Sequence, residues 1–309
     1  MENPLIALST ELAATAERAG RSVVAVNARW RNSSSGVIWR KGVIVTADHT
    51  IRREEEIRIT LPDGHTAVAE LAGRDPGTDL AVLKVDTSES PVVRATAPDS
   101  VKTGNLALAI GRSEQTGVNA AMGVVSNVSG PWHTWRGGKL DRFLRLDIGL
   151  YPGVSGAAVV DVEGKLIGIA TAGLSRSSLL AIPATTIDRV TDELLRQGHI
   201  ARGYLGVGLQ PIPFPEHLRT KLKLGSAYEG RKAGLIVLSA EPDGPAGQAG
   251  VVIGDVLIAL NGTPVAGTDD VQEFLAGEHV GKPLKASLVR GGQLMELTIM
   301  VGERPRRRA

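Results

Sequence analysis

Three short segments of the sequence carry residues that could together perform nucleophilic catalysis. His49 follows an apolar run at a turn, Asp79 precedes another apolar run, and Ser155 lies in the glycine-flanked segment Tyr151–Ala157. A serine hydroxyl becomes a strong nucleophile only when a base accepts its proton, a third group orients that base and nearby amides stabilise the oxyanion. These three residue types together predict acyl transfer at a serine.

Each segment alone is also compatible with a structural role. A histidine after a strand is commonly structural, an aspartate in a turn often binds turn amides, and Gly-Val-Ser-Gly can form a plain β-turn. The α/β-hydrolase elbow, Gly-x-Ser-x-Gly between strand and helix, does not fit, because Ala157 replaces the last glycine and a strand follows. The order histidine, aspartate, serine in a β-rich chain favours the catalytic interpretation.

The composition argues against several other kinds of site. No two of the six histidines lie within four residues of each other and cysteine is absent, so we expect no metal site, disulfide or thiol nucleophile. A phosphate-binding Gly-Lys-Ser/Thr loop is missing as well. The net charge of +2 gives no field for nucleic-acid capture. We therefore expect neither a cofactor nor a nucleic-acid partner.

The first part of the chain combines one helix with many strands. Apolar residues at helical spacing, with Asn3 as cap and Pro4 at the first helical position, predict a helical segment over residues 1–20. About a dozen short apolar or alternating runs follow, separated by turn residues, and they predict an all-β sandwich or a pair of barrels. The expected strands are Val23–Trp30, Gly36–Trp39, Val43–Thr46, Ile57–Thr60, Ala67–Leu71, Ala81–Val85, Leu106–Ile110, Val118–Val128, Phe143–Ile148, Ala157–Val162, Leu166–Leu174 and Leu179–Ile182.

A helix is expected to close this β-rich domain. Thr185–Asp188 has the pattern of a capping box, the helix runs through Leu195, and Gly198 is its stop. We therefore place the first domain at residues 21–198, with a linker at Gly198–Arg202.

Residues 203–303 have their own pattern, which predicts a compact α+β domain of about one hundred residues. The expected elements are strands Tyr204–Leu209, Leu235–Ala240, Val256–Asn261, Leu284–Val289 and Leu294–Val301 and helices His217–Leu224 and Asp269–Gly277.

The first twenty residues lack the basic start, apolar stretch and cleavage site of a secretory signal. No window supplies about 18 uninterrupted apolar residues for a membrane span. We therefore expect a cytoplasmic protein, or a periplasmic or membrane-anchored one if the sequence is a truncated piece.

These segments resemble the HtrA/Deg family, whose members carry a trypsin-like protease domain of two β-barrels followed by PDZ domains. Ser35–Ile38 and Thr46–His49 are similar to the family pattern Gly-Ser-Gly-Val-Ile…Thr-Asn-Asn-His. Asp75–Lys84 matches Asp-x-x-Thr-Asp-Leu-Ala-Val-Leu-Lys nearly residue for residue. Asp147 stands where the family's Gln-Thr-Asp-Ala segment has its aspartate.

The resemblance implies a role for each catalytic position. His49 would be the general base, Asp79 its orienting carboxylate and Ser155 the nucleophile, and the amides of Gly153 and Ser155 would form the oxyanion hole. This sequence departs from the family's Gly-Asn-Ser-Gly-Gly-Pro, because Val154 replaces the asparagine, Ala157 the second glycine and Ala158 the proline. The pair before the histidine is Ala47-Asp48 where the family has Asn-Asn. The alternative is therefore a weak or inactive pseudo-protease that acts as a chaperone or scaffold.

The resemblance also implies substrates and partners. Residues 149–154 and 172–178 would wall the primary specificity pocket, and because they contain no carboxylate we expect a small or medium apolar substrate side chain. Unfolded polypeptides would be cleaved, and a homotrimer is implied.

The second domain resembles a PDZ domain, with Ala246–Gly262 as its most recognisable run. Tyr204, Leu205, Gly206 and Val207 would form the loop that binds a peptide's C-terminal carboxylate. An ordinary α+β domain with glycine turns is the alternative.

Overall fold

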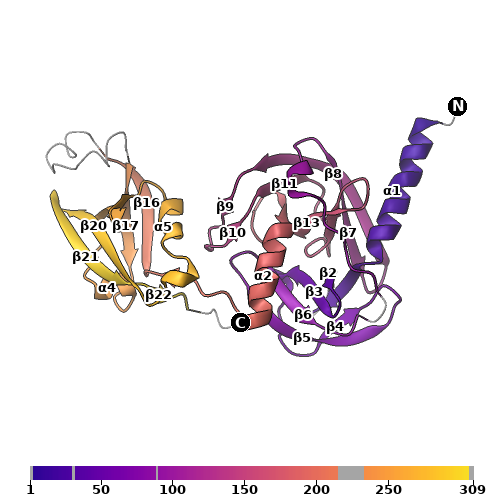
Figure 1. Ribbon diagram of the computed structural model, residues 1–309, viewed down its shortest axis with the longest axis horizontal. Helices are drawn as coiled ribbons and strands as arrows, with labels where there is room; N and C mark the ends of the chain where they lie inside the picture. The colour runs from indigo at the N-terminus through magenta and orange to yellow at the C-terminus, as the bar shows by residue number, and fades with distance from the viewer. Residues whose placement is uncertain (1–2, 30–31, 88–89, 215–232, 306–309) are drawn as a thin grey trace. The chain divides into compact units, whose positions relative to one another are not determined.

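The computed structural model describes residues 3–29, 32–87, 90–214 and 233–305. The chain divides into two compact units, Met1–Ile200 and Ala201–Ala309 (Figure 1). The helix expected at His217–Leu224 lies outside the described residues. The predicted fold class, mainly β with two barrels and a C-terminal α+β part, is confirmed.

Six antiparallel strands close into the first barrel. Their order is β1 (Val23–Asn27), β2 (Ser34–Arg40), β3 (Val43–Ala47), β6 (Leu80–Lys84), β5 (Thr66–Asp75) and β4 (Ile57–Thr60). Branched aliphatic side chains fill the interior, among them Val24, Ile38, Ile44, Ile59 and Leu83. Such residues suit a pleated, half-buried surface, and closure removes the free edges that a flat sheet would expose.

The second barrel repeats this plan. Its strands, in order, are β11 (Phe143–Asp147), β14 (Leu179–Pro183), β13 (Leu166–Thr171), β12 (Ala158–Val160), β7 (Leu106–Ser113) and β8 (Gly117–Ser129). Val125, Leu144, Leu146, Val159 and Leu179 lie in its interior. A short ribbon of β9 (Trp132–His133) and β10 (Lys139–Leu140) extends from it.

A shared hydrophobic cluster holds the two barrels together. Val37, Val45 and Leu80 from the first barrel pack in one cluster with Ile110 and Ile169 from the second. Close packing of this kind fixes the relative position of the two barrels. Loops from one barrel can therefore hold side chains against loops from the other.

A helix lies at each end of the first unit's sequence. Helix α1 (Pro4–Gly20) begins as expected, because the Asn3 side chain accepts a hydrogen bond from the amide of Leu5. Helix α2 (Ala184–Gln197) ends at Gly198, which has a φ of 75° and a left-handed conformation. Glycine tolerates this conformation, which explains the stop.

The predicted capping box at the start of α2 is wrong. The helix begins at Ala184, its cap residue is Pro183, and no side chain caps it. Instead, the Thr186 hydroxyl accepts from the amide of Asp141, and Asp188 accepts from the Trp39 indole at 2.8 Å. A tertiary partner has therefore taken Asp188, the acid of the predicted capping box.

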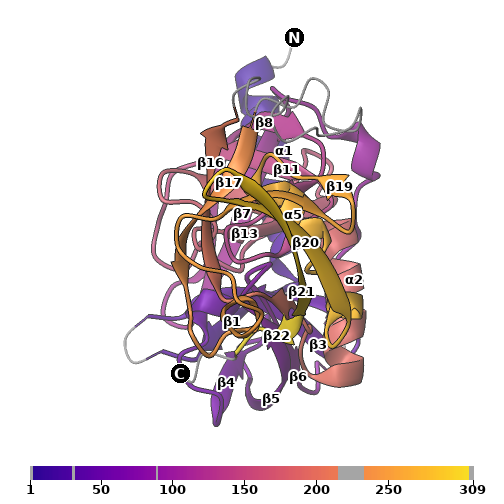
Figure 2. The ribbon, with the colours of Figure 1, turned by 90° about the vertical axis from the view of Figure 1, so that its left-hand side faces the viewer.

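The second unit is a sheet in the order β16 (Val207–Pro213), β17 (Ala233–Ala240), β18 (Val256–Leu260), β20 (Pro283–Arg290) and β21 (Gln293–Met300). Figure 2 presents this sheet to the viewer, with α5 (Thr268–Glu273) beside it. Leu235, Val237, Leu257, Ala286 and Leu288 are among its core residues.

Several short elements complete the chain. In the second unit, β15 (Gly203–Tyr204) pairs with β22 (Gly302–Glu303), β19 (Thr263–Pro264) pairs with β18, and the unpredicted helix α4 is Pro245–Gln248. Helix α5 stops before the expected Gly277, where a 3-10 turn, Gly277–His279, follows. The first unit has 3-10 turns at Asp48–Thr50 and Pro98–Ser100.

Candidate active site

The structure brings His49 and Asp79 into direct contact at one end of the first barrel. The Nδ1 atom of His49 lies 2.7 Å from Oδ2 of Asp79, and the main-chain amide of His49 donates to Oδ1 at 2.8 Å. Because a carboxylate only accepts, Nδ1 must carry the proton, which leaves Nε2 as the acceptor.

The main chain around these residues explains why they meet. Strands β3 and β6 are antiparallel neighbours, and Ala47 pairs with Leu80, so the residues just beyond this pair lie side by side. The carbonyl of Asp79 accepts from the amide of Asp48 at 3.0 Å. Asp79 has a φ of 59°, a left-handed conformation that Asp adopts more readily than most residues.

The turn before Asp79 is fixed by a second buried aspartate. The carboxylate of Asp75 accepts from the amides of Gly77 and Thr78 and from the Thr78 hydroxyl, at 2.6 to 3.1 Å. From the second barrel, the Thr134 hydroxyl donates to the carbonyl of Gly77 at 2.7 Å. This network sets the position of the Asp79 backbone.

Thr171 is a site residue that the sequence analysis missed. It ends β13, it is fully buried, and its hydroxyl donates to Oδ2 of Asp79. Two residues later, an added Cβ at Gly173 would lie 2.5 Å from Nδ1 of His49 and 2.7 Å from Oδ2 of Asp79. The Thr171 hydroxyl and the absence of a side chain at Gly173 therefore both support the His49–Asp79 pair. Neither residue belongs to a recognisable sequence pattern.

Ser155 is the second residue of the second of two consecutive tight turns. The amide of Val154 donates to the carbonyl of Tyr151 at 3.1 Å, and the amide of Ala157 donates to the carbonyl of Val154 at 3.0 Å. The third residue of each turn, Gly153 and Gly156, has a φ of 88° and 85°, respectively. This is the signature of type II turns, in which glycine is favoured at the third position.

The serine loop is held by strand β2 of the first barrel. The amide of Ser35 donates to the carbonyl of Ser155 at 3.1 Å, and the Ser35 hydroxyl donates to the carbonyl of Gly153 at 2.7 Å. A Cβ at Gly156 would collide with the carbonyl of Ser35, so only glycine fits there. The nucleophile candidate is therefore positioned by both barrels.

Two amides of this loop are available to a ligand. The amides of Val154 and Gly156 are used within the protein, the second by the carbonyl of Ala170 at 2.8 Å. Among the described residues, the amides of Gly153 and Ser155 have no acceptor. Paired amides beside a nucleophile can stabilise an oxyanion.

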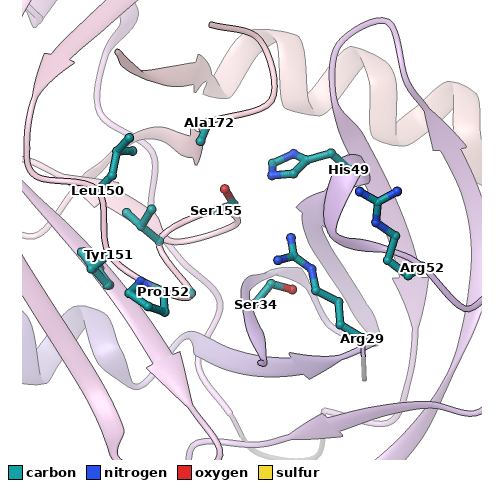
Figure 3. Close-up of a pocket in the computed structure, with 11 residues that line it drawn as sticks. Arg29, Ser34, His49, Arg52, Leu150, Tyr151, Pro152, Ser155 and Ala172 are labelled. Carbon is teal, nitrogen blue, oxygen red and sulfur yellow. The ribbon is translucent and has the colours of Figure 1, made fainter. Parts of the chain in front are cut away.

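His49 and Ser155 face the same cavity, which has a volume of about 480 Å³ (Figure 3). Both residues are described, and no hydrogen bond joins them here; such bonds are often long before substrate binds. Leu150 and Ala172 line an apolar part of the cavity. The Tyr151 hydroxyl donates to the carbonyl of Ala109, and burial raises the pKa of Tyr151 to about 12, so its side chain stays neutral.

The cavity also contains two arginines that the sequence analysis did not single out, Arg29 and Arg52. Burial and the charge of Arg52 lower the pKa of Arg29, while the Asp79 carboxylate partly opposes this. Among the described residues, no ion pair joins either guanidinium to a carboxylate. This side of the cavity is therefore strongly cationic.

Asp48, next to His49 in the sequence, is engaged elsewhere. Its carboxylate lies 2.5 Å from Nε of Arg74 and is almost fully buried. Burial raises the pKa of Asp48, although the Arg74 guanidinium acts in the opposite direction. Asp48 thus forms a structural ion pair beside the turn that carries His49.

Two departures from the family pattern beside Ser155, at Val154 and Ala157, have a structural explanation. The Val154 side chain is 4% exposed and packs in the core of the second barrel, so it occupies no part of the amide pair. Ala157 is fully buried in the same core and has no positive φ, so its position does not need glycine. Neither change disturbs the loop geometry that presents Ser155.

The predicted carboxylate-binding loop lies between β15 and β16. Gly206 has a φ of 75°, and its carbonyl accepts from the amide of Glu241 at 2.8 Å. Leu205 is buried in the core of the second unit, and Tyr204 is partly exposed. Val207 begins β16, which is the edge strand of the sheet.

The part of the chain that the structure describes contains no group of three or more His, Cys, Asp or Glu side chains placed to hold a metal ion. Within the same residues, no helix is both long and apolar enough to span a membrane.

Comparison with known protein families and solved structures agrees with the geometry. Residues 34–169 match the model of a trypsin-like peptidase domain, and residues 236–285 match a PDZ domain. A probable periplasmic DegP-like serine endoprotease of Brucella suis is 32% identical over 279 residues, or 88% of this chain. A similar protein of Pseudomonas putida is 30% identical. The chain spans about half of these relatives' length, 52% and 56%.

These names overturn one sequence-based expectation. A cytoplasmic location was predicted from the missing secretory signal, and this prediction is wrong, because the matching relatives are named periplasmic endoproteases. The first residues of a sequence report only on a leader that is still present.

Solved structures match over nearly the whole chain. The HtrA-type protease AlgW with a tripeptide is 31% identical, with a TM-score of 0.74, covering 95% of this chain and 97% of that one. A serine endoprotease from Yersinia pestis is also 31% identical, with a TM-score of 0.73 and coverage of 94% and 97%. With this identity, full-length coverage and a His–Asp pair facing a serine loop, the chain belongs to the HtrA family of trypsin-like serine proteases.

Proposed function

We propose that this protein is a serine endopeptidase that cleaves unfolded or misfolded polypeptides through an acyl-enzyme. One observation carries the proposal: His49, held by Asp79, opens on the same cavity as Ser155, beside two amides without acceptors. Serine, base, orienting acid and oxyanion donors are the complete set that acyl transfer requires. The matching relatives are named serine endoproteases.

In the first step, Nε2 of His49 removes the proton from Ser155 as Oγ attacks the carbonyl carbon of the scissile peptide. Asp79, fully buried, stabilises the imidazolium that forms. The amides of Gly153 and Ser155 donate to the oxyanion. His49 then passes its proton to the departing amine, and the acyl group remains on Ser155.

In the second step, a water molecule replaces the amine. His49 removes a proton from this water, the resulting hydroxide attacks the acyl carbon, and the same amides stabilise the second oxyanion. Collapse returns the proton to Ser155 and releases the new carboxylate. No cofactor or metal is needed for either step.

The residue before the cut is expected to be apolar and of small or medium size. Leu150, Val154 and Ala172 line the cavity, and its lining contains no Asp or Glu. A substrate Lys or Arg would therefore lose hydration there without gaining an ionic partner.

The second unit is proposed to bind peptide C-termini or extended segments. The loop Tyr204–Val207 leads into the edge strand β16, to which a peptide could add as a further strand. The structure of AlgW, an HtrA-type protease, was solved with a tripeptide and with a decapeptide. A peptide pull-down with free-acid and amidated ends tests this role, and equal binding of both ends would contradict it.

We also propose a periplasmic location and a homotrimer. The relatives' names support the location. Leu5, Ile6 and Leu8 of α1 are exposed apolar residues that a neighbouring subunit could cover. Light scattering should give three times the chain mass of 32.4 kDa, and a monomer mass would reject the trimer.

Active-site labelling tests the protease itself. A fluorophosphonate should modify the peptide containing Ser155, and the wild-type protein should cleave unfolded casein while Ser155→Ala does not. Equal, negligible cleavage by both proteins would favour the pseudo-protease alternative. Labelling of Ser155 without peptide cleavage would instead indicate a hydrolase of small esters.

A further inference from the structure

Two arginines at the catalytic cavity have no assigned role. Arg29 and Arg52 come from different segments of the first barrel, and the backbone joins these segments, because the amide of Arg52 donates to the carbonyl of Ala28 at 3.1 Å. Nε of Arg29 donates to the carbonyl of Thr50 at 3.1 Å, which anchors the first guanidinium. Both side chains line the cavity that contains Ser155.

This arrangement places two like charges together, and among the described residues neither guanidinium forms an ion pair with a carboxylate. Burial lowers the pKa of Arg29, the charge of Arg52 lowers it further, and the Asp79 carboxylate opposes both. Glu54, which follows in the sequence, is paired with Arg74 at 2.8 Å, and the cavity lining contains no carboxylate. Within this cavity, a carboxylate that pairs with the two arginines would therefore belong to a ligand.

The arginines also lie on a defined side of the nucleophile. Figure 3 shows Leu150 and Ala172 on one side of Ser155, with His49, Arg29 and Arg52 on the other. In the proposed reaction the apolar side holds the side chain of the residue before the cut, whose carbonyl becomes the acyl group on Ser155. The departing amine takes its proton from His49, so the downstream part of the substrate lies on the side of the arginines.

We propose that Arg29 and Arg52 select substrates with a carboxylate in the first two positions after the cleaved bond. The carboxylate comes from an Asp or Glu side chain or from the free end of a short departing peptide. A guanidinium binds a carboxylate through charge-assisted, often bidentate hydrogen bonds. This inference rests on the proposed peptidase function and specifies its substrate class.

The test uses fluorescence-quenched peptides with valine before the cut and amidated ends, differing only in Glu, Gln or Lys at the first two positions after it. Mass spectrometry confirms the cut site. For the wild-type protein, kcat/KM for the Glu peptide should exceed that for the Gln peptide about tenfold, with Lys lower still. A second pair of peptides ends two residues after the cut as free acid or amide, which separates the two carboxylate sources.

Substitutions then locate the effect. The Arg52 side chain is exposed, so Arg52→Gln should reduce the ratio of kcat/KM for the Glu and Gln peptides only about threefold. The double variant, with Arg29→Gln added, should bring this ratio close to one. Arg58→Gln, an exposed arginine on β4 of the same barrel, should keep the wild-type ratio. The preference should also shrink at high salt, because screening weakens exposed ion pairs.

An arylamide substrate, which has no residues after the cut, separates the two proposals. If the wild-type protein cleaves it but treats Glu and Gln peptides alike, the arginine proposal is wrong and the peptidase remains. If the protein cleaves neither the arylamide nor any peptide, the peptidase proposal fails and this inference fails with it. An unchanged ratio in the Arg52→Gln and double variants would also overturn the inference.

Discussion

Three buried aspartates lie near His49, and their partners distinguish their roles. Asp48 binds Arg74, and Asp75 accepts from the amides of its own turn. Only Asp79 has a carboxylate directed at the ring of His49. Burying a carboxylate without hydrogen-bond donors is costly, so each donor to Asp79 offsets part of that cost and fixes its position.

Thr171 should matter for catalysis although it touches no substrate. Thr171→Val keeps the shape of the side chain but removes a donor from the Asp79 carboxylate. A hydrogen bond to a charged group contributes about 1.5–3 kcal/mol, so we expect kcat to fall about tenfold or more with little change in KM. Thr171→Ser should keep most of the activity. Equal activity of all three proteins in steady-state kinetics would contradict this role.

Gly173 should be equally sensitive, for a steric reason. A methyl group there would lie 2.5 Å from Nδ1 of His49 and displace the ring. A misplacement of about 1 Å can reduce a rate about 100-fold, so Gly173→Ala should lose about two orders of magnitude in kcat. Gly130→Ala is the matched control, because a Cβ there has open space and Gly130 has no positive φ. A Gly173→Ala enzyme with wild-type kcat would refute the steric argument.

At the scale of elements, local sequence patterns predicted the features that depend on neighbouring residues, namely strands and a helix start. Alternating runs gave the strands, and Asn3 with Pro4 marked the start of α1. The predicted capping box of α2 was wrong because Asp188 binds Trp39, a partner distant in sequence. The resemblance pointed to His49, Asp79 and Ser155, but the roles of Thr171 and Arg29 depend on contacts that only the folded chain creates.

A substitution in strand β2 should disturb the serine loop as strongly as a substitution within the loop. The Ser35 hydroxyl donates to the carbonyl of Gly153 and accepts from the amide of Arg112 at 2.9 Å, so it links β2 to both the loop and β7. Ser35→Ala should destabilise the first unit by about 1–3 kcal/mol and lower kcat, because Gly153 loses the contact that orients it. Ser100→Ala, whose hydroxyl bonds only locally at the surface, is the control. Denaturant unfolding and kinetics measure both effects, and an active, fully stable Ser35→Ala protein would exclude this link.

At the scale of the whole molecule, the two units have separate hydrophobic cores. Leu194 belongs to the cluster between the barrels, whereas Leu257 belongs to the cluster of the second unit. Calorimetry should therefore show two transitions. Leu194→Ala should lower only the first unit's stability and Leu257→Ala only the second's, each by about 2–5 kcal/mol. A single transition that both variants shift together would indicate one cooperative unit instead.

Low pH should destabilise the second unit by protonating Asp255. Burial acts to raise the pKa of Asp255, but its bonds with Arg290, at 2.7 and 2.8 Å, and with the amide of Val252 outweigh this and lower it. The folded carboxyl thus loses its proton more readily than the unfolded one, so its contribution is complete above the ordinary pKa of 3.8 and is lost as the pH falls through the folded value. Asp255→Asn should lower the second unit's stability by about 2 kcal/mol near neutral pH, a figure reduced by the partial exposure of Arg290. Once the pH lies below the pKa of the folded carboxyl, which is itself below 3.8, the two proteins should converge, because the wild-type carboxyl is then also neutral. A difference that stays constant from neutral to acidic pH would mean that the ionised carboxylate does not stabilise this unit.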